Sequence, residues 1–239
     1  MKFDKASADL CERRPAIAAI WPTMRGQTVM LDCGANVAAT AEQLVDFAVM
    51  GEAFAHAIFG LDKPSVGLLN VGTEEQKGNE AVKGAAEMLR AAAAAGLPMA
   101  FHGFVEGNDI AEGTVDVVVT DGFTGNIALK TAEGTARLIS AYLRQSLKRS
   151  LLGRVGAVVA SGALNTLRRK LDPRANAGGI FLGLGGVVVK CHGGADAVSF
   201  ASALDMAISM AGADINTRIR ADRARLNFPQ ATPASMSQA

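Results

Sequence analysis

Residues that could bind an anion follow an apolar, strand-like run within residues 115–130, VDVVVTDGFTGNIALK. The β-branched run ends at Asp121, and a helical pattern begins near Ile127. Backbone N–H groups and the positive end of a helix dipole favour anions at such a junction. The candidate phosphate-binding residues here are Asp121, Gly122, Thr124 and Gly125, and the candidate catalytic residue is Asn126. An ordinary turn would need the same glycines to bend the chain, so this stretch alone leaves both interpretations open.

Four more loops with similar side chains follow strands that we predict at residues 28–33, 65–71 and 99–105 and in the glycine-rich stretch before residue 190. If the sheet is mostly parallel, all five loops lie at one edge of it. An edge with many backbone amides, lysines and side-chain amides suits an oxygen-rich anion such as phosphate. The polar or glycine residues of these loops are Asp32 and Asn36, then Asn70, Gly72, Glu74, Lys77, Gly78 and Asn79, then Glu106 and Asp109, and finally Lys190, His192, Gly193 and Asp196.

Three residues are candidate catalytic groups, and each also has a structural interpretation. Lys77 lies in a loop between glycines, where a solvated lysine is common. Asn126 could instead form a hydrogen bond within the first turn of a helix. His192 follows a strand in a glycine-rich loop, a better position for catalysis than a core. Cys33, at a strand end, fits a small buried residue better than a thiol nucleophile.

Several common site patterns are absent from the sequence. No G-x-G-x-x-G follows a first strand, and there is neither a Walker A motif nor a G-x-S-x-G nucleophile elbow. Dinucleotide-binding, P-loop and serine-hydrolase interpretations are therefore poor. The three cysteines, Cys11, Cys33 and Cys191, are widely spaced without a CxxC pair, so we expect neither a disulfide framework nor a metal site, and no cofactor.

The composition is that of a packed globular protein. The 239 residues are 49% hydrophobic, and the formal charge of +1 points to no polyanionic partner. The N-terminal residues carry charges where an export signal needs an apolar core. No apolar run approaches the roughly 18 residues of a membrane span. We therefore expect a reduced, cytoplasmic protein.

Predicted strands alternate with predicted helices, which indicates the α/β class. Helices are predicted at residues 40–59 and 80–95 and from residue 127 onwards. This alternation favours βαβ units and a mostly parallel sheet. We expect one domain at residues 15–227, preceded by a segment at 1–14 and followed by a disordered tail at 228–239.

The charge is uneven, because the region from Arg137 to Arg174 has nine basic residues and the single acid Asp172. Residues 136–171 fit a protruding amphipathic helical pair with an apolar middle. Such helices lie in membrane interfaces, although a solvated basic pair or a dimer interface explains the pattern too. Nucleic acid is a poorer partner, since few aromatic residues are available for stacking. The expected membrane contacts are Leu151, Leu152, Val155, Val158 and Val159.

Five motifs together resemble one family. They are RPAIAAIWPT, LDCGAN, LLNVGTEEQKGNE, DVVVTDGFTGNIALK and GLGGVVVKCHGGAD, in this order between residues 14 and 219. They are similar to the bacterial acyl-ACP:phosphate acyltransferases, the PlsX type of phospholipid synthesis. The resemblance implies transfer of a fatty acyl group from acyl carrier protein to inorganic phosphate. It also implies catalytic roles for Lys77 and Asn126.

The resemblance carries further expectations about fold and partners. The family has a Rossmann-like three-layer α/β/α sandwich similar to isopropylmalate dehydrogenases, and it works as a homodimer that touches an anionic membrane surface. Its acyl phosphate is passed to a membrane glycerol-3-phosphate acyltransferase. The resemblance therefore implies an acyltransferase that is peripherally associated with the membrane. Phosphate is itself the nucleophile in this reaction, so neither a serine triad nor a metal is required.

The resemblance begins just before Pro15. The family's N-terminal portion, with its glycine-rich loop, has no counterpart in this chain, and we expect an exposed sheet edge where that portion would pair. Two other functions therefore stay open. One is an inactive paralogue that only binds carrier protein or membrane, and the other is a phosphotransacetylase or dehydrogenase of the same fold.

Overall fold

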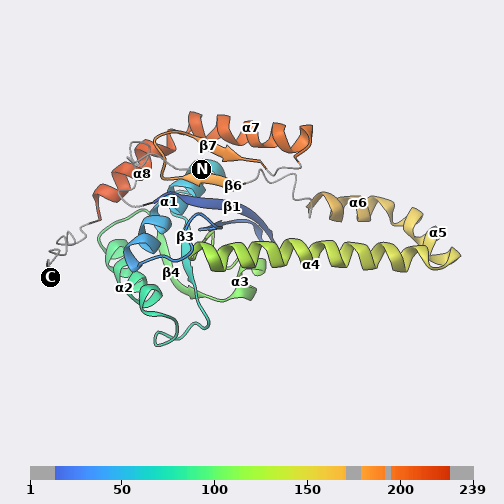
Figure 1. Cartoon of the computed structure of the whole chain (residues 1–239), viewed down its shortest axis with the longest axis horizontal. Helices are drawn as coiled ribbons and strands as arrows, with labels where there is room; N and C mark the ends of the chain where they lie inside the picture. The colour runs from blue at the N-terminus through green and yellow to red at the C-terminus, as the bar shows by residue number, and fades with distance from the viewer. Residues whose placement is uncertain (1–13, 171–178, 192–194, 227–239) are drawn as a thin grey trace, which may run out of the picture.

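The computed structural model describes residues 14–170, 179–191 and 195–226. It shows an α/β body from which one long helix, α4, projects (Figure 1). The helices of the described residues are α1 (Ala41–Phe59), α2 (Glu80–Ala94), α3 (Gly107–Glu112), α4 (Gly122–Lys148), α5 (Leu151–Val159), α6 (Ser161–Lys170), α7 (Ala197–Gly212) and α8 (Ile215–Ala224).

The strands form one seven-stranded sheet in the order β4-β3-β5-β2-β1-β6-β7. The pairs β4–β3, β3–β5 and β5–β2 are parallel, whereas β2–β1, β1–β6 and β6–β7 are antiparallel. The α/β class is therefore confirmed, but the sheet is mixed, and only one half of it is parallel as expected. The strands are β1 (Ala16–Thr23), β2 (Gly26–Leu31), β3 (Ser65–Leu69), β4 (Ala100–Val105), β5 (Val117–Val119), β6 (Gly179–Leu182) and β7 (Val188–Lys190).

Helix α1 fills the main core on one face of the sheet. Its N-terminus is fixed by a capping box, in which Thr40 and Gln43 bond to each other's backbone N–H groups, and Gly60 ends it at φ 69°. Gly51 lets the helix approach the sheet closely, because a side chain there would meet Leu31 and Val117. The large core follows from this close packing, since α1 is buried along most of its length.

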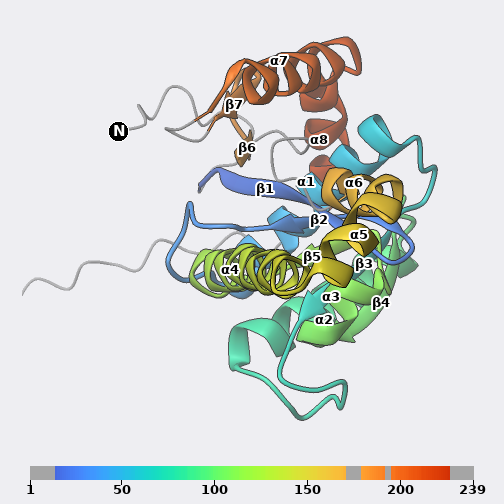
Figure 2. The same ribbon diagram turned by 90° about the vertical axis from the view of Figure 1, so that its right-hand side faces the viewer.

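The opposite face of the sheet is covered less completely. A smaller cluster there includes Met30, Val105, Ile110 and Val118, with α3 and the beginning of α4 lying over it. Figure 2 views the molecule along α4 and shows α7 on one side of β1 and α4 on the other. Because α4 leaves the body after a few turns, part of this face stays open.

Helix α8 is tied to α1 by buried ion pairs. Arg218 lies 2.9 Å from Glu52, and Arg223 lies 2.9 Å from Asp46. Burial raises the pKa of Glu52, although the hydrogen bond and charge of Arg218 oppose that rise. Asp222 adds a second, longer contact of 3.6 Å to Arg218. These pairs hold the last described helix on the body.

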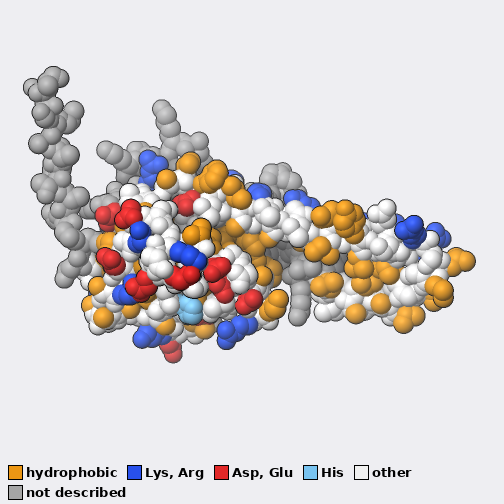
Figure 3. Space-filling model, turned by 90° about the horizontal axis from the view of Figure 1, so that it is seen from below, with side chains coloured by type: hydrophobic (Ala, Val, Ile, Leu, Met, Phe, Trp, Pro, Cys, Tyr) orange, Lys and Arg blue, Asp and Glu red, His pale blue; other side chains and the backbone are white. Residues whose placement is uncertain are grey.

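We refer to α4, α5 and α6 together as the arm. Helix α4 has 27 residues and only two of them, Gly122 and Gly125, are buried. Seen from below, the arm shows hydrophobic side chains with basic ones near its tip, whereas acidic side chains gather on the body (Figure 3). The predicted membrane residues lie on α5 and are 62–85% exposed: Leu151, Leu152, Val155, Val158 and Val159.

No single described helix has both the length and the apolar composition to cross a membrane. Helices α7 and α8 meet those two criteria only when they are taken as a pair, across a bend of 53°. Ile215 and Ile219 of α8 are buried in the main core of the body.

Three elements differ from the sequence predictions. Residues 16–23 form β1, a strand that we did not predict; Pro22 lies near its end, where a missing N–H is tolerated. Residues 107–112 form α3 in a predicted loop. The expected helical pair at 136–171 is instead the outer part of α4, followed by α5 and α6.

Candidate active site

A buried carboxylate organises the turn after β2. Asp32 is fully buried, and its two oxygens accept hydrogen bonds from the backbone N–H groups of Ile17, Gly34, Ala35 and Asn36 at 2.7–3.1 Å. The side-chain amide of Asn36 donates to the same carboxylate at 2.8 Å and to the Pro15 carbonyl at 2.9 Å. Asn36 therefore commits its side-chain N–H groups to the turn and lies 2% exposed.

The N-terminus of α4 packs directly on this turn. A side chain at Gly122 would meet the Asn36 carbonyl oxygen and the Asp32 carboxylate, and one at Gly125 would meet the Asp32 carbonyl oxygen. The Gly122 N–H donates to the Asn36 carbonyl at 2.8 Å. Both glycines are thus required by contact between two backbones rather than by flexibility.

Asp121 caps α4. Its carboxylate accepts from the Thr124 backbone N–H and from the Thr124 hydroxyl, each at 2.8 Å, and its carbonyl accepts from the Gly125 N–H at 2.9 Å. The backbone amides of Gly122, Thr124 and Gly125 consequently have protein acceptors already. These residues, predicted to bind phosphate, build the turn that positions the next residue of the helix.

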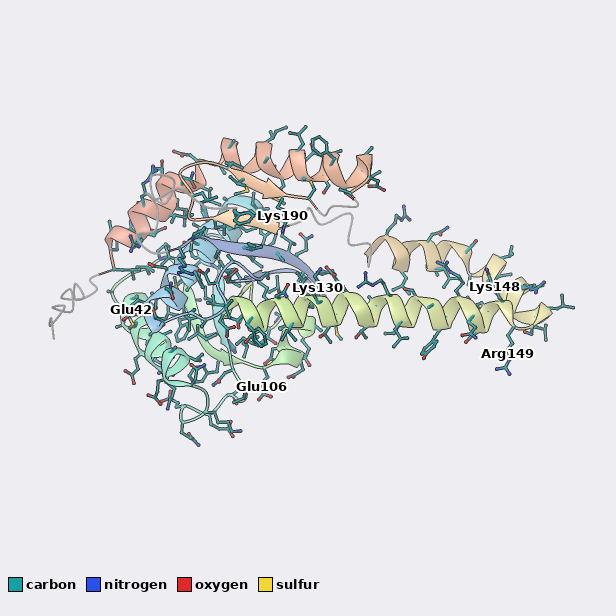
Figure 4. All side chains as sticks on the ribbon, viewed as in Figure 1. Glu42, Glu106, Lys130, Lys148, Arg149 and Lys190 are labelled. Carbon is teal, nitrogen blue, oxygen red and sulfur yellow. The ribbon has the colours of Figure 1, made fainter. Side chains whose placement is uncertain are left out.

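That next residue, Asn126, lies beside Gly34 and is exposed at an open cleft of ≈ 2130 Å³ between α4, β1, α6 and β7. Lys130 and Lys190 line the same cleft, and Figure 4 shows Lys130 near the base of α4 and Lys190 at the end of β7. Among the described residues, neither Asn126 nor Lys190 has a hydrogen-bond partner for its side chain. Lys130 pairs with Glu133 at 3.0 Å.

Cys33 also borders the cleft, but its environment opposes thiolate formation. Burial raises the pKa of the Cys33 thiol well above its ordinary value, and the nearby charge of Asp32 raises it further. The thiol donates to the Met30 carbonyl at 3.3 Å. Cys33 is therefore a small buried residue, as predicted.

A second group of predicted residues forms the loop between β3 and α2. The side-chain amide of Asn70 closes this loop by donating to the carbonyls of Gly72 and Lys77, each at 3.0 Å. Gly78 adopts φ 95°, a conformation that favours glycine, and a side chain there would collide with Asn70. Asn79 caps α2 by accepting from the Val82 N–H at 2.9 Å.

Lys77 folds back over Gly72 onto Glu74. Its Nζ lies 2.8 Å from Glu74 Oε2, and a side chain at Gly72 would collide with both residues. The hydrogen bond and charge of Glu74 raise the pKa of Lys77, and the same hydrogen bond lowers the pKa of Glu74. Lys77 is a fully charged, half-exposed ammonium that can exchange its carboxylate for another anion.

The two groups leave the same edge of the sheet from adjacent strands. Strands β3 and β5 are parallel neighbours, so the loop after β3 emerges beside the turn after β5, with strands about 4.8 Å apart. No residue of 70–79 is among the described residues that line the cleft. The structure therefore brings Lys77 to the correct edge without bringing it into contact with Asn126.

Lys190 reaches the cleft from a different direction than expected. Strand β7 is antiparallel to β6, which runs antiparallel to β1, which in turn runs antiparallel to β2. The carboxyl end of β7 therefore faces away from the edge shared by β2, β3, β4 and β5, and the prediction of five loops at one edge is corrected to four. Lys190 and Asn126 nevertheless line the same cleft.

His192 and Gly193 lie outside the described residues. Asp196, from the same predicted loop, caps α7 by accepting from the Ser199 N–H at 2.9 Å. Glu106 and Asp109 form a reciprocal cap at the start of α3. Within the described ranges, no group of three or more His, Cys, Asp or Glu residues is arranged to hold a metal ion.

Lys130 and Asp32 were missing from the predicted site residues. Lys130 follows Asn126 by four positions, which places both on one side of a helix, so this spacing could have identified it. Asp32 was recognised as a loop residue, but its role depends on five hydrogen bonds that no local pattern indicates.

Comparison with known proteins gives consistent matches. The family described as "Fatty acid synthesis protein" matches residues 11–218. A phosphate acyltransferase of Parvibaculum lavamentivorans is 60% identical over 214 residues, covering 90% of this chain and 58% of the relative. A phosphate acyltransferase of Rhizobium meliloti is 56% identical over 222 residues, covering 93% and 63%, respectively. This chain thus spans about three fifths of the length of these relatives.

Two solved structures share the fold at low sequence identity. One is EutD phosphotransacetylase from Staphylococcus aureus, with a TM-score of 0.55, 17% identity, and coverage of 84% of this chain and 54% of that chain. The other is a branched-chain phosphotransacylase from Enterococcus faecalis, with a TM-score of 0.51, 17% identity, and coverage of 84% and 66%. At this identity the likeness establishes the α/β architecture alone.

Proposed function

This chain belongs to the fatty acid synthesis protein family, and from that premise we propose that it transfers a fatty acyl group from acyl carrier protein to inorganic phosphate. The observation that carries the proposal is Asn126, an unpartnered side-chain amide held at the start of α4 and facing an open, mostly apolar cleft. A site of this kind offers a donor to a developing oxyanion without a protein nucleophile.

The reaction needs only bound phosphate and a thioester. A phosphate oxygen attacks the thioester carbonyl carbon, and the carbonyl oxygen takes up the electron pair to form a tetrahedral oxyanion. Collapse re-forms the carbonyl, breaks the carbon–sulfur bond and releases the carrier protein as a thiolate. An ordinary thiol has a pKa near 8.5, so this leaving group needs little assistance from an acid. The product is an acyl phosphate.

We assign Asn126 the role of donating a hydrogen bond to the oxyanion, because its side-chain amide has no partner among the described residues and lies at the cleft. The Asp32 turn, Asn36, Gly122 and Gly125 fix the position of the helix that carries it. A donor that is held in place before the reaction does not have to reorient when the negative charge develops. Most of the catalytic benefit of such a group arises from this preorganisation. Asp121 and Thr124 act in the same positioning role.

We assign the binding of phosphate to two lysines near the cleft and to the loop that carries one of them. Lys77 would exchange Glu74 for a phosphate oxygen, while Asn70, Gly72, Gly78 and Asn79 shape its loop. Lys190, which has no described partner, would contribute a second cation from β7. Closing the distance between Lys77 and the cleft requires the loop at residues 70–79 to move when phosphate binds.

The direct test is turnover. Purified protein is incubated with palmitoyl-ACP and phosphate, and the release of free carrier protein and of a hydroxylamine-trappable acyl phosphate is measured. We expect release that depends on phosphate. No release above a no-enzyme control would refute the activity for this chain, and turnover of acetyl-CoA instead would favour a short-chain phosphotransacetylase.

Asn126→Ala tests the oxyanion assignment. Removing one such donor lowers kcat by about 10²–10³-fold, while substrate binding changes little. The matched control is Asn165→Ala, an exposed asparagine on α6 that does not line the cleft. Equal kcat values for the two folded variants would contradict the assignment.

Lys77→Ala tests the phosphate assignment. Lys83→Ala is a close control, because Lys77 and Lys83 each pair with a glutamate three residues earlier. We expect the Lys77 variant to have a strongly raised KM for phosphate and the Lys83 variant to match the wild type. An unchanged phosphate KM in Lys77→Ala would remove this residue from the site.

We further propose that the protein is cytoplasmic and binds anionic membranes peripherally through α5. The support is five exposed apolar residues beside Lys148, Arg149 and Arg154 at the end of the arm. Liposomes containing phosphatidylglycerol should sediment the protein, less so at high salt. Val155→Glu should abolish this, whereas Val198→Glu on α7, equally exposed at 62%, should not. Equal sedimentation of both variants would contradict the proposal.

Two partners complete the proposed function. An acyl phosphate is an activated acyl donor, and we propose that a membrane glycerol-3-phosphate acyltransferase consumes it. A homodimer is supported by the apolar, exposed side of α7 that is formed by Phe200, Leu204 and Ile208, which are spaced four residues apart. Sedimentation equilibrium should show a dimer that Phe200→Glu dissociates and Leu152→Glu leaves intact; a monomeric wild type would contradict it.

A further inference from the structure

The cleft continues well beyond Asn126 along α4. On the helix side, its apolar lining recurs every three or four residues, which places the side chains in one stripe on one side of the helix. This stripe consists of Leu129, Ala132, Ala136, Ile139, Leu143 and Leu147. A continuous apolar stripe that starts three residues from a proposed oxyanion donor needs a ligand with a long apolar part.

The opposite side of the cleft is also apolar near its base. Ile17, Ala19 and Trp21 alternate along β1 and point to the sparsely covered face of the sheet, where Ile17 and Trp21 stay only partly buried. Leu164 and Leu167 of α6 lie farther out. The base of the cleft is therefore bounded by apolar side chains from two elements, with polar groups concentrated at Asn126, Lys130 and Lys190.

The outer part of the cleft has a different character. From Arg137 onwards the lining includes Arg144, Lys148 and Arg149. The described part of the arm contains no acid beyond Glu133 to balance them. Between Leu129 and Ala136 the two charged lining residues, Lys130 and Glu133, pair with each other at 3.0 Å. An uncharged chain is therefore best accommodated along this part of α4, where the cleft adjoins the sheet.

We propose that this inner part of the cleft binds the fatty acyl chain of the substrate, with the thioester at Asn126 and the chain directed outwards along α4. The inference rests on the proposed transfer of an acyl group, and it adds where the chain lies and which residues limit its length. No covalent step is involved beyond the transfer itself.

The dimensions fit one long acyl chain. The hydrocarbon core of a bilayer is about 30 Å thick and two chains deep, so one chain extends roughly 15 Å. At 1.5 Å per residue, that length reaches from Asn126 to about Ala136. The chain end therefore lies just where the basic residues begin, and Ala132 lies about 9 Å from Asn126.

Three alanines of α4 that line the cleft provide the test: Ala132 and Ala136 belong to the stripe, and Ala141, outside it, is the control. Ala132, Ala136 and Ala141 lie about 9, 15 and 22 Å from Asn126, and each is replaced by phenylalanine in the full chain. The kcat/KM values are measured with octanoyl-ACP and palmitoyl-ACP. Ala132→Phe should lower the palmitoyl value about tenfold relative to the octanoyl value, Ala136→Phe should do so less, and Ala141→Phe should not change the ratio.

A second measurement does not depend on turnover. A palmitic acid probe with a photoreactive group at its methyl end should label wild-type peptides near Ala136 and Ile139, and the label should be displaced by unmodified palmitic acid. Labelling elsewhere, or an unchanged chain-length ratio in all three folded variants, would overturn the proposal. If no acyl-ACP is turned over but the probe labels α4, the acyl site stands and the proposed activity fails.

A second copy of the chain is the main competing occupant. If it fills the cleft, Ala132→Phe would shift the protein from dimer to monomer in sedimentation equilibrium and would affect both substrates equally. That result would overturn the acyl site. An unchanged oligomeric state with an altered chain-length ratio supports it.

Discussion

The body and the arm contain similar apolar side chains and place them in opposite environments. Leu89 of α2 is fully buried, whereas Leu152 of α5 is 85% exposed. The body packs α1 and the sheet into one large core, while the outer arm has no buried residue on α5. Stability should therefore depend on the body, and the arm should contribute to function through its surface rather than to stability through packing.

The largest expected effect compares two leucines on helices. Leu89→Ala should lower the free energy of unfolding by about 4 kcal/mol, because it leaves a cavity in the core. Leu152→Ala should change it by less than about 0.5 kcal/mol. Urea denaturation measures both; a large loss from Leu152→Ala would mean that the arm is packed against something in solution.

A smaller loss is expected from the ion pairs that hold α8. Arg218→Met leaves Glu52 buried without its cation and should cost about 3 kcal/mol at neutral pH. Burial raises the pKa of Glu52 and Arg218 opposes that rise, so removing Arg218 raises the pKa further, and the folded variant takes up a proton more readily than the folded wild type as the pH falls. The difference in the free energy of unfolding between the wild type and Arg218→Met should therefore shrink as the pH falls through the pKa of Glu52 in the folded variant towards the ordinary value of 4.5.

Urea denaturation of Arg218→Met at several pH values checks this. Arg220→Met, an exposed arginine on the same helix, is the control and should show no such dependence. A loss that grows as the pH falls would show that Glu52 is not the group responsible.

Two glycines of α4 compare the part of the arm that packs on the body with the part that projects from it. Gly125→Ala should lower stability by about 2 kcal/mol and reduce activity, because the new methyl group would collide with the Asp32 carbonyl. Gly134→Ala has open space and should stabilise the helix by about 1 kcal/mol. Thermal unfolding compares them, and equal shifts would contradict this difference between the two parts.

The smallest effect on stability is expected at the tip of the arm. Arg149→Gln should leave the midpoint of urea denaturation unchanged, since Arg149 is exposed and its side chain supports no packing. The affinity of this variant for anionic liposomes should fall about fivefold, because one basic residue near such a surface contributes about 1 kcal/mol. Unaltered liposome binding would mean that Arg149 does not contribute and that the apolar residues of α5 account for the binding.

Much of the body could be predicted because its signals are local. Thr40 and Gly60 mark the ends of α1, and the run before Asp121 marks β5. The antiparallel half of the sheet could not be predicted, since strand direction depends on how β1, β6 and β7 pair over long separations. This pairing is also why Lys190 arrives from the other direction.

The sequence predicted which residues belong to the site better than it predicted how they are arranged. Asn126 follows a strand-to-helix turn whose sequence signals are strong, and the structure places it at the cleft. The sequence motifs could not show that Gly122 and Gly125 serve contact with the Asp32 turn, because that contact joins segments about ninety residues apart. Nor could they show that Lys77 is held by Glu74 away from Asn126.

Helix α4 is one uninterrupted element from the proposed oxyanion donor to the start of α5, about 40 Å in length. Only Arg149 and Ser150 separate this helix from α5, which carries the residues proposed to meet the membrane. A bilayer that holds α5 would therefore also set the height and the orientation of the reacting thioester above its surface. The acyl phosphate that we propose as the product would then leave at a fixed distance from the lipid phase.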